Sequence, residues 1–294
     1  MKPFSMLITD SGLGGLSICA EVVEGLGRGR EPRSVAVTYF NARPEQDGGY
    51  SFMPTLEEKL RVFDQALLGM ARFQPDLLVI ACNTLSALYP RTAFSRGNQI
   101  PTLEIIEFGV QMMFERLRLQ PRSQVIIFGS PVTIEEGAHA SRLIAKGIRP
   151  DRIIAQPCPG LALGIEADPA SRDVGEMVSR FVGEAAARMP AGPRPILAAL
   201  CCTHFGYSLA AFERALAAHF QGVPTILDPN RAMSAHLCPG DGLPGQPEVH
   251  IELNVVSKIL WSPEKIASIS AALESVSPAT AEALRRYRHD PELF

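Results

Sequence analysis

The sequence lacks the features that mark several large classes of protein. No apolar run approaches the ~18 residues of a membrane-spanning helix. The N-terminal stretch Met1 to Ile8 is too short for a signal peptide and runs directly into Asp10. The net charge is only −3 and no stripe of Lys or Arg stands out, so a nucleic-acid partner is not indicated. These absences predict a cytoplasmic protein with neither a membrane nor a nucleic-acid partner.

The six cysteines and six histidines lack the spacings of a metal site. No two cysteines form a C-x-x-C pair, and no histidine lies in an H-E-x-x-H motif. The glycines after the first apolar run do not complete a dinucleotide-binding fingerprint, because Ser17 stands where the third glycine should be. We therefore expect no metal and no cofactor, and we expect the cysteines to be free thiols.

Short apolar runs bounded by Gly, Pro or Asp alternate with helical patterns along the chain. This alternation is typical of a parallel sheet whose strands are buried on both faces. The clearest helix is expected over residues 56–73, where Thr55 with Glu58 makes a capping box. Strands are expected at Met6–Thr9, Val35–Phe40, Leu77–Ala81, Val125–Phe128, Arg152–Ala155, Ile196–Leu200 and Thr225–Leu227, with a later strand at His250–Val256 followed by two helices.

The chain also shows signs of an internal repeat. The interval from Asp10 to Cys82 is 72 residues, and so is the interval from Ser130 to Cys202, although one matching interval also arises by chance. We expect an α/β fold of two related, pseudo-symmetric lobes with mainly parallel sheets and the active site between them. The first lobe is expected to contain residues 1–103 plus 225–294, and the second residues 104–224.

Two cysteines follow predicted strands, each beside polar residues. Cys82 begins the run Cys-Asn-Thr, and Cys202 begins the run Cys-Thr-His. Ligands of open α/β sheets bind beyond the carboxyl ends of the strands, so both cysteines are expected to face a ligand. The alternative is that Cys82 is a small buried hydrophobic residue. A thiolate and a thiol suit racemisation without a cofactor, which needs a base on one face of a carbon acid and an acid on the other.

Four segments, in order, resemble the signatures of glutamate racemases, which belong to the aspartate/glutamate racemase superfamily. They are Asp10-Ser11-Gly12-Leu13-Gly14-Gly15-Leu16-Ser17, Cys82-Asn83-Thr84, Cys158-Pro159 with the downstream Glu166, and Cys202-Thr203-His204. The resemblance covers positions from about 8 to 230. It implies a cofactor-independent racemase whose partner is a small molecule, either an amino acid or a related carbon acid.

The resemblance also implies roles for the matching residues. Cys82 would exchange the proton of the D-enantiomer with help from Asp10. Cys202 would exchange that of the L-enantiomer with help from His204 and Glu166. The residues expected to bind the substrate are Ser11, Asn83, Thr84 and Thr203, with Ser130 as a further binding residue.

The chain departs from glutamate racemases in two segments. Where that family carries Pro-Tyr-Gly after its second strand, Glu45 and Gln46 follow a proline here, and Asp47 begins an insertion. That turn helps to bind glutamate in the family, and a carboxylate in the pocket would repel a substrate carboxylate. We therefore expect glutamate to be a poor substrate and a neutral or cationic amino acid to be preferred. Residues from about 240 onward also depart, and are expected to form either an oligomer contact, such as that of a homodimer, or a lid.

Other functions fit the same residues. A second class is another superfamily member, such as a hydantoin racemase or a maleate-type isomerase. Decarboxylases of the group keep only the second cysteine, so the presence of both argues against that activity. A third class is a catalytically silent homologue that binds a small ligand, and retention of Asp10, His204 and Glu166 beside both thiols argues against it.

Overall fold

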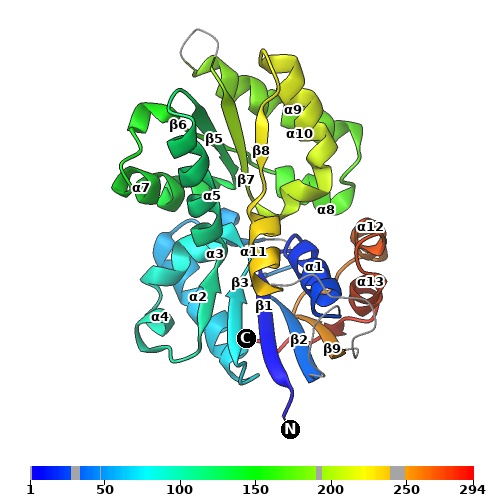
Figure 1. Ribbon diagram of the computed structural model, residues 1–294. Coiled ribbons are helices and arrows are strands. Elements are labelled where there is room, and N and C mark those ends of the chain that lie inside the picture. Colours follow the sequence, from blue (N-terminus) through cyan, green and yellow to red (C-terminus); the bar gives the residue numbers. More distant parts are fainter. Residues whose placement is uncertain (1, 28–33, 47, 190–193, 239–248) are drawn as a thin grey trace.

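Two α/β lobes stacked one above the other make up the protein (Figure 1). The structure is a computed structural model that describes residues 2–27, 34–46, 48–189, 194–238 and 249–294. Each lobe is built on one sheet whose strands pair in parallel, as the sequence predicts. The first sheet consists of β1 (Phe4–Asp10), β2 (Ser34–Asn41), β3 (Leu77–Ile80), β4 (Thr102–Glu104), β9 (His250–Ser257) and β10 (Arg288–His289). The second sheet consists of β5 (Gln124–Gly129), β6 (Ile153–Pro157), β7 (Ile196–Cys201) and β8 (Thr225–Leu227).

The two sheets share one strand order. The second sheet has the order β6-β5-β7-β8, and β2-β1-β3-β4 repeat that order in the first sheet, which β9 and β10 extend beyond β2. The strand β1 thus corresponds to β5, and β3 to β7. Cys82 comes shortly after β3, and Cys202 immediately after β7. The structure therefore confirms the prediction of two related lobes.

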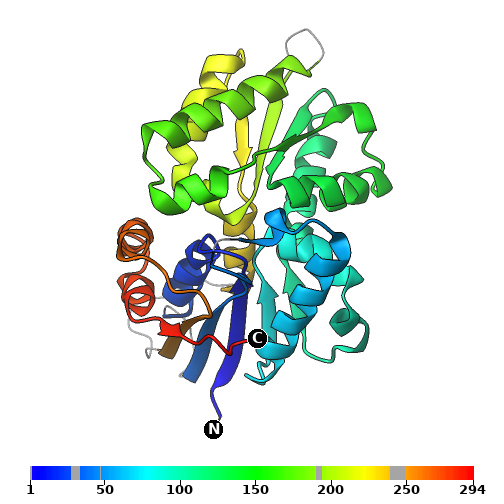
Figure 2. The ribbon, with the colours of Figure 1, turned by 180° about the vertical axis from the view of Figure 1, so that it is seen from behind.

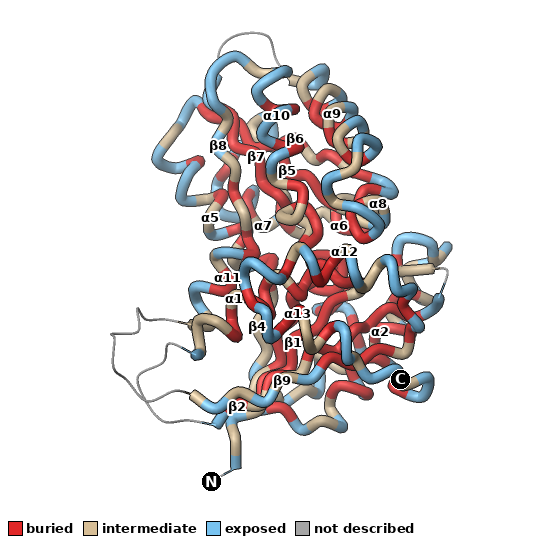
Figure 3. The backbone as a smooth tube through the Cα atoms, turned by 90° about the vertical axis from the view of Figure 1, so that its right-hand side faces the viewer, coloured by how far each residue is buried: buried red, intermediate tan, exposed pale blue. Residues whose placement is uncertain are grey.

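Apolar side chains cover both faces of each sheet, because successive strand residues point to opposite sides. In β1, Ile8 packs in one core and Leu7 in the other, and in β5 Ile126 and Ile127 divide in the same way. Strands with two buried faces appear in the sequence as continuous apolar runs, which is why they were predictable. Buried residues are concentrated along the centre of each lobe (Figure 3).

Helices cover both faces of each sheet (Figure 2). The predicted helix over 56–73 is α2, and its cap forms as expected, because Thr55 Oγ1 accepts a hydrogen bond from the Glu58 backbone N–H. No helix in the described part of the chain is long and apolar enough to cross a membrane. The helices are α1 (Leu16–Gly27), α2 (Leu56–Ala71), α3 (Asn83–Leu88), α4 (Ala93–Gly97), α5 (Ile105–Leu119), α6 (Pro131–Glu136), α7 (Ala138–Ala145), α8 (Leu161–Ala167), α9 (Arg172–Ala187), α10 (Leu209–His219), α11 (Pro229–Leu237), α12 (Pro263–Glu274) and α13 (Pro278–Arg285), with 3-10 helices η1 (Tyr50–Phe52), η2 (Tyr89–Arg91), η3 (Pro150–Arg152) and η4 (Thr203–Ser208).

The segment from residue 249 onward completes the first lobe. The strand β9 pairs with β2 over the whole length of both strands, and α12 and α13 share a core with α1. The predicted division into 1–103 plus 225–294 and 104–224 remains a proposal, with one change. Thr225–Leu227 forms β8 and pairs with β7 in the second sheet, so we place the chain's return to the first lobe after Leu227.

Candidate active site

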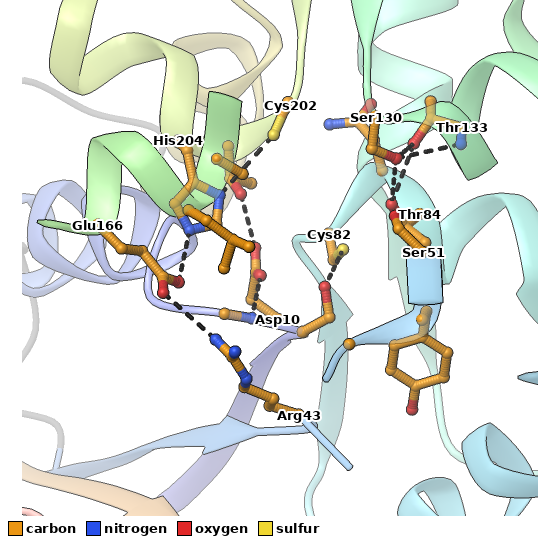
Figure 4. A pocket seen from close by; sticks show the side chains of 18 of the residues that line it. Asp10, Arg43, Ser51, Cys82, Thr84, Ser130, Thr133, Glu166, Cys202 and His204 are labelled. Atoms are coloured by element: carbon orange, nitrogen blue, oxygen red, sulfur yellow. Dashed lines mark hydrogen bonds and ion pairs between the residues drawn. The ribbon is translucent and has the colours of Figure 1, made fainter. Parts of the chain in front are cut away.

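A pocket lies between the two lobes, where the carboxyl ends of β1, β3, β5 and β7 meet (Figure 4). The structure brings together in its lining every residue that the sequence predicts for the site. These residues are Asp10, Ser11, Cys82, Asn83, Thr84, Ser130, Glu166, Cys202, Thr203 and His204. Their shared position is a structural fact, whereas their individual roles stay predictions.

Cys82 immediately precedes α3 and is almost fully buried. Its Sγ lies 3.2 Å from the hydroxyl oxygen of Ser11, which follows β1. Burial, with a further contribution from the charge of Asp10, raises the pKa of Cys82 to about 12. At neutral pH this thiol is therefore protonated, and it can donate a proton to a ligand in the pocket.

Cys202 lies in a different electrostatic environment. Its Sγ is 3.7 Å from Nδ1 of His204, whose Nε2 is 2.9 Å from Oε1 of Glu166. Burial opposes a charged imidazole, but the hydrogen bonds to Cys202 and Glu166 outweigh it and raise the pKa of His204 well above its ordinary value. A protonated His204 stabilises a thiolate at Cys202. The two cysteines therefore differ in their surroundings, because Cys82 is a buried thiol and Cys202 adjoins the imidazole of His204.

Asp10, at the end of β1, connects the two lobes. Its Oδ2 accepts a hydrogen bond from the Thr203 hydroxyl at 2.7 Å, and its Oδ1 accepts one from the Gly12 backbone N–H at 2.8 Å. Burial raises the pKa of Asp10, and the charge of His204 opposes this change. The hydrogen bond of Thr203 ties Asp10 to the side of the pocket that carries Cys202. Assistance from Asp10 to Cys82 stays a prediction.

Three hydroxyl groups form another wall of the pocket (Figure 4). Thr84 Oγ1 lies 2.8 Å from Ser130 Oγ and 3.1 Å from Thr133 Oγ1, and the last two oxygens are 2.9 Å apart. Thr84 comes from the first lobe, whereas Ser130 caps α6 in the second. Thr133 lies in the first turn of α6, and the sequence analysis missed it because it does not directly follow the end of β5 at Gly129. The three hydroxyls offer polar groups without a charge.

Asn83 presents a free donor to this pocket. Its Oδ1 lies 3.1 Å from Nε2 of His139 in α7, and its buried Nδ2 has no hydrogen-bond partner among the described residues. Burial lowers the pKa of His139 to about 3, so the ring is neutral at pH 7. An amide oxygen only accepts, so Nε2 of His139 must donate. The amide nitrogen of Asn83 therefore has unused donor capacity among the described residues, and its role in binding a substrate stays a prediction.

The segment after β2 differs from the expected arrangement. Glu45 and Gln46 are exposed and do not line the pocket, and Asp47 lies outside the described residues. The prediction that Glu45 repels a substrate carboxylate is therefore wrong. A short antiparallel bridge joins Glu45 to Gly48, and the pocket is lined instead by Arg43 and residues 49–52.

Comparisons with known sequences find relatives named glutamate racemase. No family model matches the chain. A glutamate racemase from Paracoccus denitrificans is 27% identical over 225 residues, which are 71% of this chain and 76% of that protein. A glutamate racemase from Nitratiruptor is 25% identical over 78% of this chain and 81% of its own length. The match to a glutamate racemase from Syntrophus aciditrophicus, at 28% identity, spans about half of each protein.

Solved structures of similar fold cover nearly the whole chain. Glutamate racemase from Campylobacter jejuni superposes with a TM-score of 0.67 at 18% identity, over 97% of this chain and 99% of that one. Glutamate racemase from Francisella tularensis, solved with D-glutamate, gives a TM-score of 0.68 at 18% identity, over 95% and 94%. An aspartate racemase from Picrophilus torridus gives 0.52 at 13% identity, over 80% and 93%. At these identities the neighbours show a shared fold.

Proposed function

From its membership of the aspartate/glutamate racemase superfamily and its resemblance to glutamate racemase, we propose that this chain is a cofactor-independent amino-acid racemase. The observation that carries the proposal is the pair of cysteines lining one pocket from facing lobes. Cys82 is a buried thiol whose pKa is raised to about 12. Cys202 adjoins the imidazole of His204, whose positive charge favours a thiolate at the cysteine. Such a pair supplies an acid and a base without a metal or coenzyme.

The proposed reaction moves two protons and breaks one C–H bond. The Cys202 thiolate removes the α-proton from one face of the bound amino acid, which leaves a carbanion. The Cys82 thiol then delivers its proton to the opposite face, and a C–H bond of inverted configuration forms. Cys202 ends as a thiol and Cys82 as a thiolate, so the reverse reaction uses the same two groups in exchanged roles.

The sharpest test of this proposal follows deuterium rather than optical rotation. Wild-type protein incubated in deuterium oxide with a panel of single amino-acid enantiomers is expected to replace the α-proton of at least one of them, as read by proton NMR. The inverted product is expected to carry deuterium at that carbon. Absence of exchange with every amino acid tested would contradict the proposal and favour a silent ligand-binding protein.

A second hollow bears on the identity of the substrate. A space of about 170 Å³ adjoins the pocket and shares with it Phe52, Ser130, Leu163 and Cys202. No Asp, Glu, Lys or Arg side chain occurs among the described residues that line this hollow. A carboxylate leaving water for such a site would need a compensating charge. We therefore propose that the preferred amino acid has a neutral, largely apolar side chain, with glutamate as a poorer substrate.

This specificity can be tested by adding a charge at the hollow. In wild-type protein we expect kcat/KM for leucine or phenylalanine to exceed that for glutamate. The exposed position of Leu163 tolerates a polar group, and Leu163→Lys is expected to raise the ratio of glutamate to leucine kcat/KM by about 10-fold through charge pairing. Leu119→Lys, at an exposed leucine that lines neither the pocket nor the hollow, is the control for the added charge. The highest kcat/KM for glutamate in wild type would overturn this specificity.

A further inference from the structure

Glu166 is buried at the centre of a cluster of donors drawn from both lobes. Its Oε1 accepts from His204 Nε2 at 2.9 Å and from the Leu13 backbone N–H at 3.0 Å. Its Oε2 accepts from Lys265 Nζ at 3.0 Å and faces Arg43 Nη1 at 3.4 Å. The two oxygens therefore have separate tasks. Oε2 binds the cationic side chains of Lys265 and Arg43, and Oε1 binds the His204 imidazole that faces Cys202.

Lys265 and Arg43 come from the two segments in which the chain departs from glutamate racemases. Lys265 lies in the first turn of α12, and Arg43 follows β2. The ring of Trp261 packs against both cations, with its centroid 5.5 Å from the Arg43 guanidinium carbon and 5.2 Å from Lys265 Nζ. The Gln46 amide also exchanges two hydrogen bonds with the backbone of Leu260. The two departing segments thus form one joined structure over Glu166.

The charges of this cluster determine the state of the carboxylate. Burial alone would raise the pKa of Glu166, but hydrogen bonding and charge from His204, together with the charges of Lys265 and Arg43, lower it to about 2. The charged groups around Glu166 are therefore Arg43, Lys265 and His204, with Asp10 beyond the imidazole. A permanently ionised, immobile carboxylate fixes the orientation of the imidazole ring.

We propose that Lys265 is a positioning residue of the catalytic site, which acts through Glu166 and His204 to maintain the thiolate of Cys202. The inference rests on the proposed function for its catalytic meaning. The connection runs from Lys265 Nζ to Glu166 Oε2, from Oε1 to His204 Nε2, and from Nδ1 to the Cys202 sulfur, over steps of 3.0, 2.9 and 3.7 Å. Lys265 itself does not line the pocket. The C-terminal segment is therefore part of the catalytic apparatus and not only a lid or an oligomer contact.

The test measures the thiolate directly and does not depend on activity. Iodoacetamide alkylates thiolates, and tandem mass spectrometry distinguishes Cys202 from its buried neighbour Cys201. Lys265 helps to keep the buried Glu166 carboxylate ionised and fixed in place, and without it the His204 imidazolium beside Cys202 loses part of this support. In Lys265→Met the pH midpoint of Cys202 alkylation is therefore expected to rise by about 0.5 unit or more. Lys265→Arg keeps the charge and is expected to retain the wild-type midpoint.

The matched control is Lys258→Met. Lys258 belongs to the same C-terminal segment, but it donates to the Phe294 carbonyl oxygen, away from the pocket. If Lys258→Met raises the midpoint as much as Lys265→Met does, or if Lys265→Met leaves it unchanged, the inference is wrong. A raised midpoint in a protein that exchanges no α-proton would support the inference and contradict the proposed function.

Kinetics supply a second measurement wherever the wild type is active. Because Lys265 does not touch the ligand, Lys265→Met is expected to lower kcat by about 10-fold and to change KM by less than about 2-fold. The acid limb of the kcat profile is expected to move to higher pH, in the same direction as the alkylation midpoint. If Lys265 only stabilised the fold, Lys265→Met would lower Tm. It would leave unchanged both the acid limb of the kcat profile and the pH midpoint of Cys202 alkylation.

Discussion

Replacing Cys202 with alanine is expected to lower the racemisation rate by at least about 10³-fold, because the variant lacks the group that accepts the α-proton. Cys82 cannot replace it, since burial keeps the Cys82 thiol protonated at neutral pH. Cys82→Ala is expected to stop inversion to a similar extent. That variant keeps the Cys202 and His204 pair, so it is expected to exchange deuterium into one enantiomer, the L-form by resemblance to the family, without inverting it.

The measurement is deuterium incorporation by NMR together with chiral chromatography of the product. Cys238→Ala is the control, because Cys238 donates a weak hydrogen bond to the Val22 carbonyl oxygen far from the pocket. This control is expected to keep most of the activity. Near wild-type racemisation by Cys202→Ala would show that the two-thiol mechanism is wrong.

Gly14→Ala is expected to impair both activity and stability, because Gly14 of the first lobe lies against Thr203 and His204 of the second. A Cβ atom there would lie 2.6 Å from His204 Nδ1 and 2.7 Å from the His204 backbone nitrogen, and would also contact the Thr203 hydroxyl. The backbone atom cannot rotate away, so the lobes must separate or His204 must shift. We expect a destabilisation of about 1–3 kcal/mol. A shift of the imidazole by a fraction of an ångström is expected to lower kcat by about 100-fold.

The matched control is Gly27→Ala at the end of α1, where an added Cβ meets no atom within 4 Å. This variant is expected to show wild-type kcat and an unchanged or slightly higher Tm, since alanine favours a helix. Thermal unfolding and steady-state kinetics on both variants test this prediction by giving the Tm and the kcat of each. Equal behaviour of the two alanine variants would mean that the contact between the Gly14 loop and His204 is not required.

The sequence predicted the sheets and the catalytic pocket well, for identifiable physical reasons. Strands such as β5 have two buried faces and therefore form unbroken apolar runs, and the polar residues that end such runs at Cys82 and Cys202 indicate ligand contact. Two short strands escaped notice. The strand β4 (Thr-Leu-Glu) contains one apolar residue and β10 (Arg-His) contains none, so neither forms an apolar run.

The partners of Glu166 could not be found in the same way. Lys265 lies 99 residues from Glu166 in sequence and Arg43 lies 123 residues away, and neither belongs to a local motif. Only the folded arrangement of β2, α8 and α12 brings them together. The error at Glu45 has a related cause, because residue type predicted a charge near the substrate, whereas a turn directs that side chain to solvent.

The pairing of β9 with β2 has a consequence for the order in which the protein can be assembled during synthesis. Every strand of the second sheet lies between Gln124 and Leu227, so this sheet can form once that continuous stretch has left the ribosome. The first sheet needs Ser34–Asn41 and His250–Ser257 together, and pairing over such a separation closes a long loop at a high entropic cost. The strand edge of β2 therefore remains open until translation has passed β9. A ribosome stalled before residue 250 would carry one finished lobe and one unprotected sheet edge, which is a site for chaperone binding or for aggregation.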